Sequence, residues 1–186
     1  MGALQKEQYY TYEEWLNLNL GDNTRSELID GEIYLLASAS TRHQSIAGEI
    51  FSQLSTYLKG KRCKPFWGLD VRLEKDTVVI PDLLVVCDSR KLTDAGCTGT
   101  PDLVIEILSP STAKHDRFTK FLLYQRTGVP EYWIVDPADN ILTIHRLSDG
   151  KYITSVYEST DIATVDALPG FEMDLSTVFM EESNEE

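Results

Sequence analysis

The stretch that decides the fold runs from Val78 to Tyr124. It begins with VVIPDLLVVCD (78–88), passes through a loop, and continues as PDLVIEILSPSTAKHDRFTKFLLY (101–124). Near-continuous apolar runs of this kind predict β-strands that are covered on both faces of a sheet. Each run also carries one acidic residue, Asp82 in the first and Glu106 in the second. We therefore expect two carboxylates beside or inside a buried sheet.

The position of each carboxylate suggests a chemical use. Burial of a carboxylate costs several kcal/mol unless the group is paired, protonated or bound to a metal, and Glu106 lies inside its apolar run. Asp82 follows Pro81 at a strand start, where an ordinary turn aspartate is the alternative. Lys120 comes from the helix that follows, where a solvated lysine or a pair with Asp116 is the alternative. If the strands are neighbours, the two carboxylates can coordinate Mg²⁺ through oxygen.

The rest of the chain predicts a mixed α/β domain. A capping-box pattern at Thr11–Glu14 predicts a short helix that ends at Gly21-Asp22, and apolar residues at four-residue intervals predict a long helix over 40–59. Asp30-Gly31 and Asp149-Gly150 predict hairpin turns. Further strands are expected over 65–73, 77–87, 103–108 and 131–136, a loop over 88–100 and a helix over 113–126. We expect one domain over 1–180 and a disordered acidic tail over 181–186.

Composition narrows the class of protein. No apolar run approaches the roughly 20 residues that a membrane span needs, and the N-terminus shows no signal peptide. The three cysteines, Cys63, Cys87 and Cys97, are odd in number and form no CxxC pair, so we expect neither a disulfide framework nor a zinc site. Cys87 is expected to be a buried thiol. These features favour a cytoplasmic protein.

Net charge argues against tight, non-specific binding of DNA. The formal charge is −13, whereas phosphate contacts usually come from Lys and Arg. The basic residues are unevenly distributed, however, and a local basic groove remains compatible with the sequence. They form two clusters, Lys59, Lys61, Arg62 and Lys64 in one and Lys114, Arg117, Lys120 and Arg126 in the other.

An ordered set of motifs resembles a known family. ELIDGEIY (27–34), RHQSI (42–46), VIPDLLVV (79–86), PDLVIEILSPST (101–112) and GVPEYWIVDP (128–137) together resemble the Uma-type restriction endonucleases of the PD-(D/E)XK nuclease superfamily. The resemblance extends from about Thr11 to Leu147. It implies a restriction-endonuclease-like core, with a mixed central sheet flanked by helices, and often a homodimer.

The resemblance also implies roles for individual residues. Asp82 and Glu106 take the places of the two acidic residues of the superfamily. The lysine of the E-x-K motif would fall at position 108, where this chain has Leu108, and in the Uma-type family Lys120 of the following helix matches the basic role. Glu27 matches an extra acidic residue that some of these nucleases use on the metal.

Our hypothesis is a Mg²⁺- or Mn²⁺-dependent endonuclease acting on DNA. Asp82 and Glu106 would hold the metal with Glu27 assisting, and Lys120 would orient the attacking water. One alternative is a catalytically degenerate nuclease-like module that binds nucleic acid or has a regulatory role. Another is a dimer in which the polar cluster is only structural. His43 is expected to be a hydrogen-bonded residue near the cleft. Four further residues are expected to play structural parts: Asp102 at a strand start, Ser109 as a helix cap, and His115 and His145 at the surface or in the core.

Overall fold

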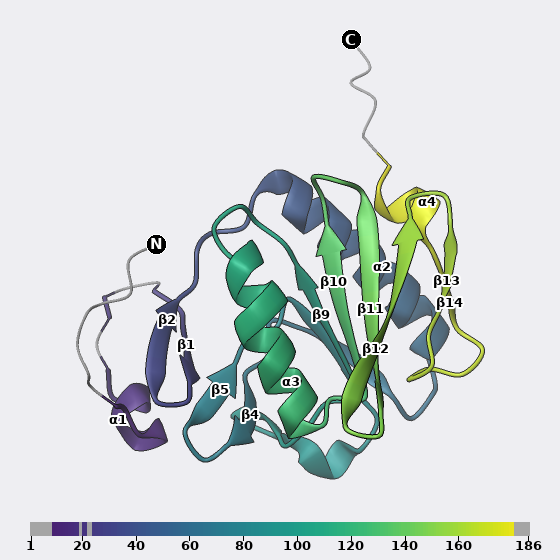
Figure 1. Cartoon of the computed structure of the whole chain (residues 1–186). Helices are drawn as coiled ribbons and strands as arrows, with labels where there is room; N and C mark the ends of the chain where they lie inside the picture. The colour runs from purple at the N-terminus through teal and green to yellow at the C-terminus, as the bar shows by residue number, and fades with distance from the viewer. Residues whose placement is uncertain (1–8, 19, 22–23, 181–186) are drawn as a thin grey trace.

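A computed structural model describes residues 9–18, 20–21 and 24–180 (Figure 1). The first eight residues, Asp22 and the predicted tail over 181–186 lie outside these ranges. Within them, no helix is long and apolar enough to cross a membrane.

The fold centres on a six-stranded mixed sheet, the main sheet, with the strand order β12-β11-β10-β9-β6-β3. Its strands are β3 (Lys64–Trp67), β6 (Leu83–Val86), β9 (Leu103–Ile107), β10 (Glu131–Asp136), β11 (Ile141–Ser148) and β12 (Lys151–Glu158). Strands β9 and β10 run parallel, and the other neighbouring pairs are antiparallel. Glu106 therefore lies in an interior strand, between β6 and β10.

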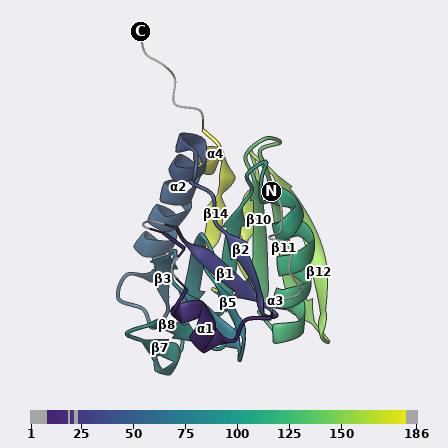
Figure 2. The same cartoon turned by 90° about the vertical axis from the view of Figure 1, so that its left-hand side faces the viewer.

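Helices cover both faces of the main sheet (Figure 2). They are α2 (Thr41–Leu58) on one face and, on the other, the continuous helix formed by η2 (His115–Lys120) and α3 (Phe121–Thr127). Leu54 of α2 shares a core with Ile105, and Leu123 of α3 shares a second core with Val104. Because neighbouring strand residues point to opposite faces, β9 contributes to both cores. Both of its faces are buried, as its apolar sequence predicts.

A second sheet, the outer sheet, has the strand order β2-β1-β5-β4-β8-β7. Its strands are β1 (Ser26–Ile29), β2 (Glu32–Leu35), β4 (Val71–Glu74), β5 (Thr77–Val79), β7 (Leu92–Thr93) and β8 (Gly96–Thr98). Ile29 and Val79 of this sheet join the core under α3. All four residues of β1, including Glu27, are consequently buried.

Small elements complete the described chain. They are α1 (Tyr12–Leu16), η1 (Ser89–Lys91), β13 (Ile162–Thr164), β14 (Glu172–Asp174) and α4 (Leu175–Val178). The last three add Met173 and Val178 to the core under α2. The predicted capping box of α1 and both predicted hairpin turns are confirmed. The predicted loop over 88–100 instead contains η1, β7 and β8.

The chain passes between the two sheets at two places where the sequence predicts unbroken strands. The predicted strand over 65–73 is β3 and β4, one in each sheet, divided near Gly68, whose φ of +54° favours glycine. The predicted strand over 77–87 is β5 and β6, divided around Pro81, which has no N–H for a strand ladder. Both predictions of a single strand are wrong, because an apolar pattern does not say which sheet a strand joins. Asp82 lies at the second crossing.

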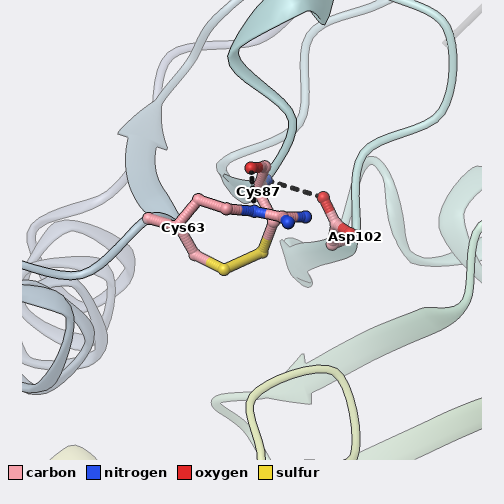
Figure 3. Close-up of a disulfide and its surroundings, with 4 residues drawn as sticks. Cys63, Cys87 and Asp102 are labelled. Atoms are coloured by element: carbon pink, nitrogen blue, oxygen red, sulfur yellow. Dashed lines mark hydrogen bonds between the residues drawn. A yellow bond between two sulfur atoms is a disulfide. The ribbon is translucent and has the colours of Figure 1, made fainter.

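The prediction for the cysteines is also wrong in part. Cys63 and Cys87 form a disulfide, and Cys97 is a free, buried thiol. Lys64 pairs with Val86 in the antiparallel β3–β6 ladder, so the next position outward brings the two cysteines together. The backbone of Cys87 is held as well, because its N–H donates to Asp102 Oδ2 at 2.7 Å (Figure 3).

Candidate functional site

Lys120 lies at the centre of a cluster of carboxylates that come from three elements. Its Nζ lies 2.8 Å from Glu106 Oε1 in the main sheet and 2.8 Å from Glu27 Oε1 in the outer sheet. Asp116, one turn earlier in the same helix, has its Oδ1 3.7 Å away. All four side chains are buried. The structure therefore brings together three of the residues that the sequence singles out.

Asp82 lies at the more exposed edge of this cluster. Its Oδ2 accepts hydrogen bonds from the backbone N–H of Ile107 at 2.8 Å and from His43 Nε2 at 3.1 Å. Extending the pairing of Leu83 with Ile105 by one residue puts Asp82 opposite Glu106. The Asp82 side chain is 28% exposed, against 5% for Glu106, so solvent reaches the cluster at Asp82.

Glu27 is held from two sides. Its Oε1 accepts the backbone N–H of Ile80 at 2.8 Å in addition to pairing with Lys120. Its Oε2 lies 3.7 Å from His115 Nε2, and neither atom makes a hydrogen bond with a described residue. The ring of His115 lies against that of Tyr34, with 4.4 Å between the centroids. The expectation that His115 lies at the surface or in the core misses its place beside Glu27.

The geometry of the helix explains why its polar residues meet. Residues 115–120 form a π-helical segment, and α-helical geometry follows. In an α-helix, the side chain four positions along lies about 40° beyond one full turn. In the wider π-helix, the side chain four positions along has not yet completed a full turn. The two deviations oppose each other, so Asp116, Lys120 and Tyr124 stay in line. Tyr124 completes this line by donating its O–H to Glu106 Oε1 at 2.8 Å.

The apolar residues Phe118, Phe121 and Leu122 of the same helix, which the sequence would place on one buried face, do not form such a face. Phe121 packs partly against the core, whereas Phe118 and Leu122 are mostly exposed. The polar residues, not these two, face the sheet.

Burial and the ammonium of Lys120 shift the pKa values of the carboxylates in different directions. Burial is the main cause that raises the pKa of Glu106 well above its usual value, against the opposing effect of Lys120. Burial also raises the pKa of Asp116. For Glu27, burial is outweighed by Lys120, His115 and the Ile80 N–H, so its pKa is lowered. Burial alone would lower the pKa of Lys120, but the surrounding carboxylates raise it well above its usual value. Glu27 and Lys120 are therefore the firmly ionised pair.

The donor set suits a divalent cation. The cluster holds more carboxylates than cations, and oxygen is the ligand that Mg²⁺ prefers. Asp82 Oδ1 and Glu106 Oε2 accept no hydrogen bond from any described residue. In the described chain, no three acidic, His or Cys side chains already form a metal-binding group. Mg²⁺ commonly takes one or two carboxylates and completes its shell with water and substrate phosphate, which Asp82 and Glu106 fit.

Two other predictions concern residues around the site. Asp102 does not take the place of Asp82, because its carboxylate binds the N–H of Cys87 at the opposite end of β9 from Glu106. The hydroxyls of Ser109, Ser111 and Thr112 bond to one another where the helix begins. They stand in the sequence between Glu106 and Lys120. Neither serine hydroxyl accepts a backbone N–H from the described helix, so the predicted capping by Ser109 is wrong.

Three residues of the second basic cluster pair with carboxylates of the same chain. Lys120 is buried, Arg117 pairs with Asp136, and Arg126 pairs with Asp30. In the first cluster, Arg62 donates to the carbonyl of Cys87, whereas Lys59, Lys61 and Lys64 are exposed. Of the second cluster only Lys120 is buried, while Lys114, Arg117 and Arg126 are exposed.

Comparison with known proteins places these features in context. The model of the Uma2 family, described as "Putative restriction endonuclease", matches residues 7–176. The chain is 29% identical to the uncharacterized protein slr1290 of Synechocystis sp. over 154 residues, or 80% of each chain. It is 31% identical to the uncharacterized protein sll1609 of the same organism over 132 residues, or 68% of this chain and 74% of that one.

A solved structure has the same fold. The crystal structure of a "putative nuclease belonging to DUF820" from Anabaena variabilis matches with a TM-score of 0.76 and 24% identity. The match covers 91% of this chain and 97% of that chain. The mixed, restriction-endonuclease-like fold that the sequence predicts is thereby confirmed.

Proposed function

The chain belongs to the Uma2 family, and on that premise we propose that it is a Mg²⁺- or Mn²⁺-dependent endonuclease that hydrolyses phosphodiester bonds of DNA. One observation carries the proposal. Lys120 Nζ lies 2.8 Å from the carboxylate of Glu106, although the two residues come from a helix and a strand. An ammonium thus reaches the strand carboxylate in a chain that has Leu108 where the superfamily pattern has lysine.

Each side chain of the cluster has a part in this proposal. Asp82 and Glu106 hold the cation, which when bound lowers the pKa of a water and offsets negative charge on the phosphodiester. Lys120 orients the attacking water and stabilises negative charge near the scissile phosphate. Glu27 holds the Lys120 ammonium through its Oε1, and its Oε2 is a further candidate ligand. Tyr124 fixes Glu106 with its O–H.

The substrate follows from the family and not from surface charge. DNA is the substrate that a restriction endonuclease cleaves, and the homodimer that the resemblance implies belongs to the same proposal. The net charge of −13 and Leu108 favour the rival reading, a nuclease-like module without catalysis. Metal binding separates the two readings, because it does not require the correct DNA sequence to be known.

The test compares Glu106→Gln with the control Glu131→Gln. Glu131 is also a buried glutamate, on the adjacent strand β10, but it bonds Trp133 and Ala167 instead of Lys120. Purified proteins are titrated with Mn²⁺ by calorimetry and then incubated with supercoiled plasmid and Mg²⁺ or Mn²⁺. We expect Glu106→Gln to lose Mn²⁺ binding and to nick DNA on the order of 100-fold more slowly, and the control to keep both properties.

Two results would reject the proposal. Equal cleavage by wild type and Glu106→Gln would remove the carboxylate from the chemistry. A folded wild type that neither binds Mn²⁺ nor cleaves plasmid would favour the binding module.

A further inference from the structure

His43 is the one side chain from α2 that contacts the carboxylates of the site, as far as the described residues show. It lies in the first turn of α2, where the Ser40 hydroxyl accepts its backbone N–H at 3.2 Å. The helix start is therefore fixed, and the ring is held against the main sheet. His43 is 8% exposed, and its Nε2 lies 3.1 Å from Asp82 Oδ2.

The two oxygens of Asp82 have different surroundings. Oδ2 accepts two hydrogen bonds, from the N–H of Ile107 at 2.8 Å and from His43. Oδ1 accepts none from the described residues. Two donors on one oxygen fix the rotation of the carboxylate, and they leave the other oxygen for a ligand.

Asp82 needs this support because of its position. It lies where the chain leaves β5 and enters β6, and its backbone carbonyl accepts the N–H of Gly68 at 3.1 Å, but this bond does not fix the side chain. Its side chain is also the most exposed of the acidic groups in the cluster. An aspartate in such a place would otherwise adopt several rotamers, at a cost in side-chain entropy on binding a cation.

We propose that His43 is a positioning residue, which together with the Ile107 N–H holds Asp82 so that Oδ1 alone is presented to the divalent cation. This inference rests on the proposed function and adds a residue to it. The second nitrogen of the ring, Nδ1, is buried and has no hydrogen-bond partner in the described chain. Among the described residues, Asp82 is therefore the one side chain that the ring of His43 hydrogen-bonds.

Glutamine and asparagine at position 43 test this role, because their amide groups reach different distances from the backbone. The amide nitrogen of glutamine overlays Nε2 of histidine, whereas that of asparagine overlays Nδ1, which does not contact Asp82. His43→Gln and His43→Asn therefore put similar polar groups into the same site, but only the glutamine can donate to Oδ2. His145→Asn is the matched control. His145 is equally buried, yet its Nδ1 bonds Thr154 and no carboxylate.

The measurement is Mn²⁺ affinity by calorimetry for the full chain, with thermal unfolding of each metal-free protein to show that it is folded. Removing a side chain that orients a metal ligand typically weakens metal binding by about 10- to 100-fold. We expect that loss for His43→Asn, and affinities within about 3-fold of wild type for His43→Gln and His145→Asn.

The outcomes separate this inference from the function on which it rests. If folded His43→Asn binds Mn²⁺ as tightly as wild type, or if His43→Gln binds as weakly as His43→Asn, the inference is overturned and the nuclease proposal stands. If folded wild type does not bind Mn²⁺, the nuclease proposal fails and the inference fails with it.

Discussion

Two buried histidines illustrate how the immediate surroundings decide what a residue does. His43 has a carboxylate partner in Asp82, which raises its pKa although burial opposes the rise. His145 lies among the rings of Phe121, Tyr132 and Tyr152 and has no charged partner in the described chain. Burial there lowers the pKa of His145 to about 4. The two rings are equally buried, so the partner and not the burial makes the difference.

The low pKa of His145 predicts a pH dependence of stability. The unfolded chain takes up a proton near pH 6.5, while the folded chain resists it until about pH 4. Stability from this residue is therefore present above pH 6.5 and is lost as the pH falls toward 4, by about 3 kcal/mol. Urea unfolding at pH 7 and pH 4 should show a loss about 3 kcal/mol smaller in His145→Asn, which does not titrate. An equal loss in the two proteins would contradict the prediction.

The sequence reveals some site residues and hides others for identifiable reasons. Glu106 stands out because a carboxylate interrupts an apolar run, and Asp82 because a PD dipeptide precedes another run. Lys120 could be selected only through the family resemblance. The four-residue spacing of Asp116 and Lys120 indicates a pair within the helix, which the structure contains. His115 gives no such signal, since its place beside Glu27 depends on a π-helical turn that no residue pattern in this chain marks.

At the scale of elements, the paths of strands set the limit of prediction. The hairpins at Asp30-Gly31 and Asp149-Gly150 and the helix α2 follow from local patterns. The division of β3 from β4 and of β5 from β6 does not, because both members of each pair are extended and the sequence does not say which sheet each strand joins. The disulfide is hidden for the same reason, since Cys63 and Cys87 meet only when β3 pairs with β6.

The disulfide predicts a response to reductant. It ties β3, at the edge of the main sheet, to the interior strand β6 across a separation of 24 residues. Closing a loop of that length stabilises a protein by about 3 kcal/mol, or about 10 °C in Tm for a chain of this size. Dithiothreitol should lower the Tm of wild type and of Cys97→Ala by this amount. Cys63→Ser should show no shift, and a shift in that variant would exclude the bond as its cause.

At the scale of the whole molecule, Lys120 joins parts that are distant in the sequence. It contacts the outer sheet at Glu27 and the main sheet at Glu106, and it belongs to the helix between them. The candidate site is thus complete only when both sheets and the helix have docked. In the proposed function, catalysis and assembly depend on the same ammonium.

This linkage predicts a large loss of stability for Lys120→Met. The substitution keeps an unbranched side chain but leaves buried carboxylates without their cation, at a cost of about 3–5 kcal/mol. Lys114→Met, at an exposed position of the same chain segment, should change stability by less than about 0.5 kcal/mol. Adding Glu27→Gln to Lys120→Met should recover part of the loss. Urea unfolding measures all three variants, and a loss below about 1 kcal/mol for Lys120→Met would show that the buried charges are compensated elsewhere.

The stability that the contacts of Lys120 provide also affects how much folded protein a cell retains. A loss of a few kcal/mol enlarges the unfolded fraction that chaperones and proteases act on, and 1–2 kcal/mol can already change abundance several-fold. A gene copy whose Lys120 codon has changed would therefore yield less protein as well as an altered site. Selection on folding alone would therefore act against loss of this lysine.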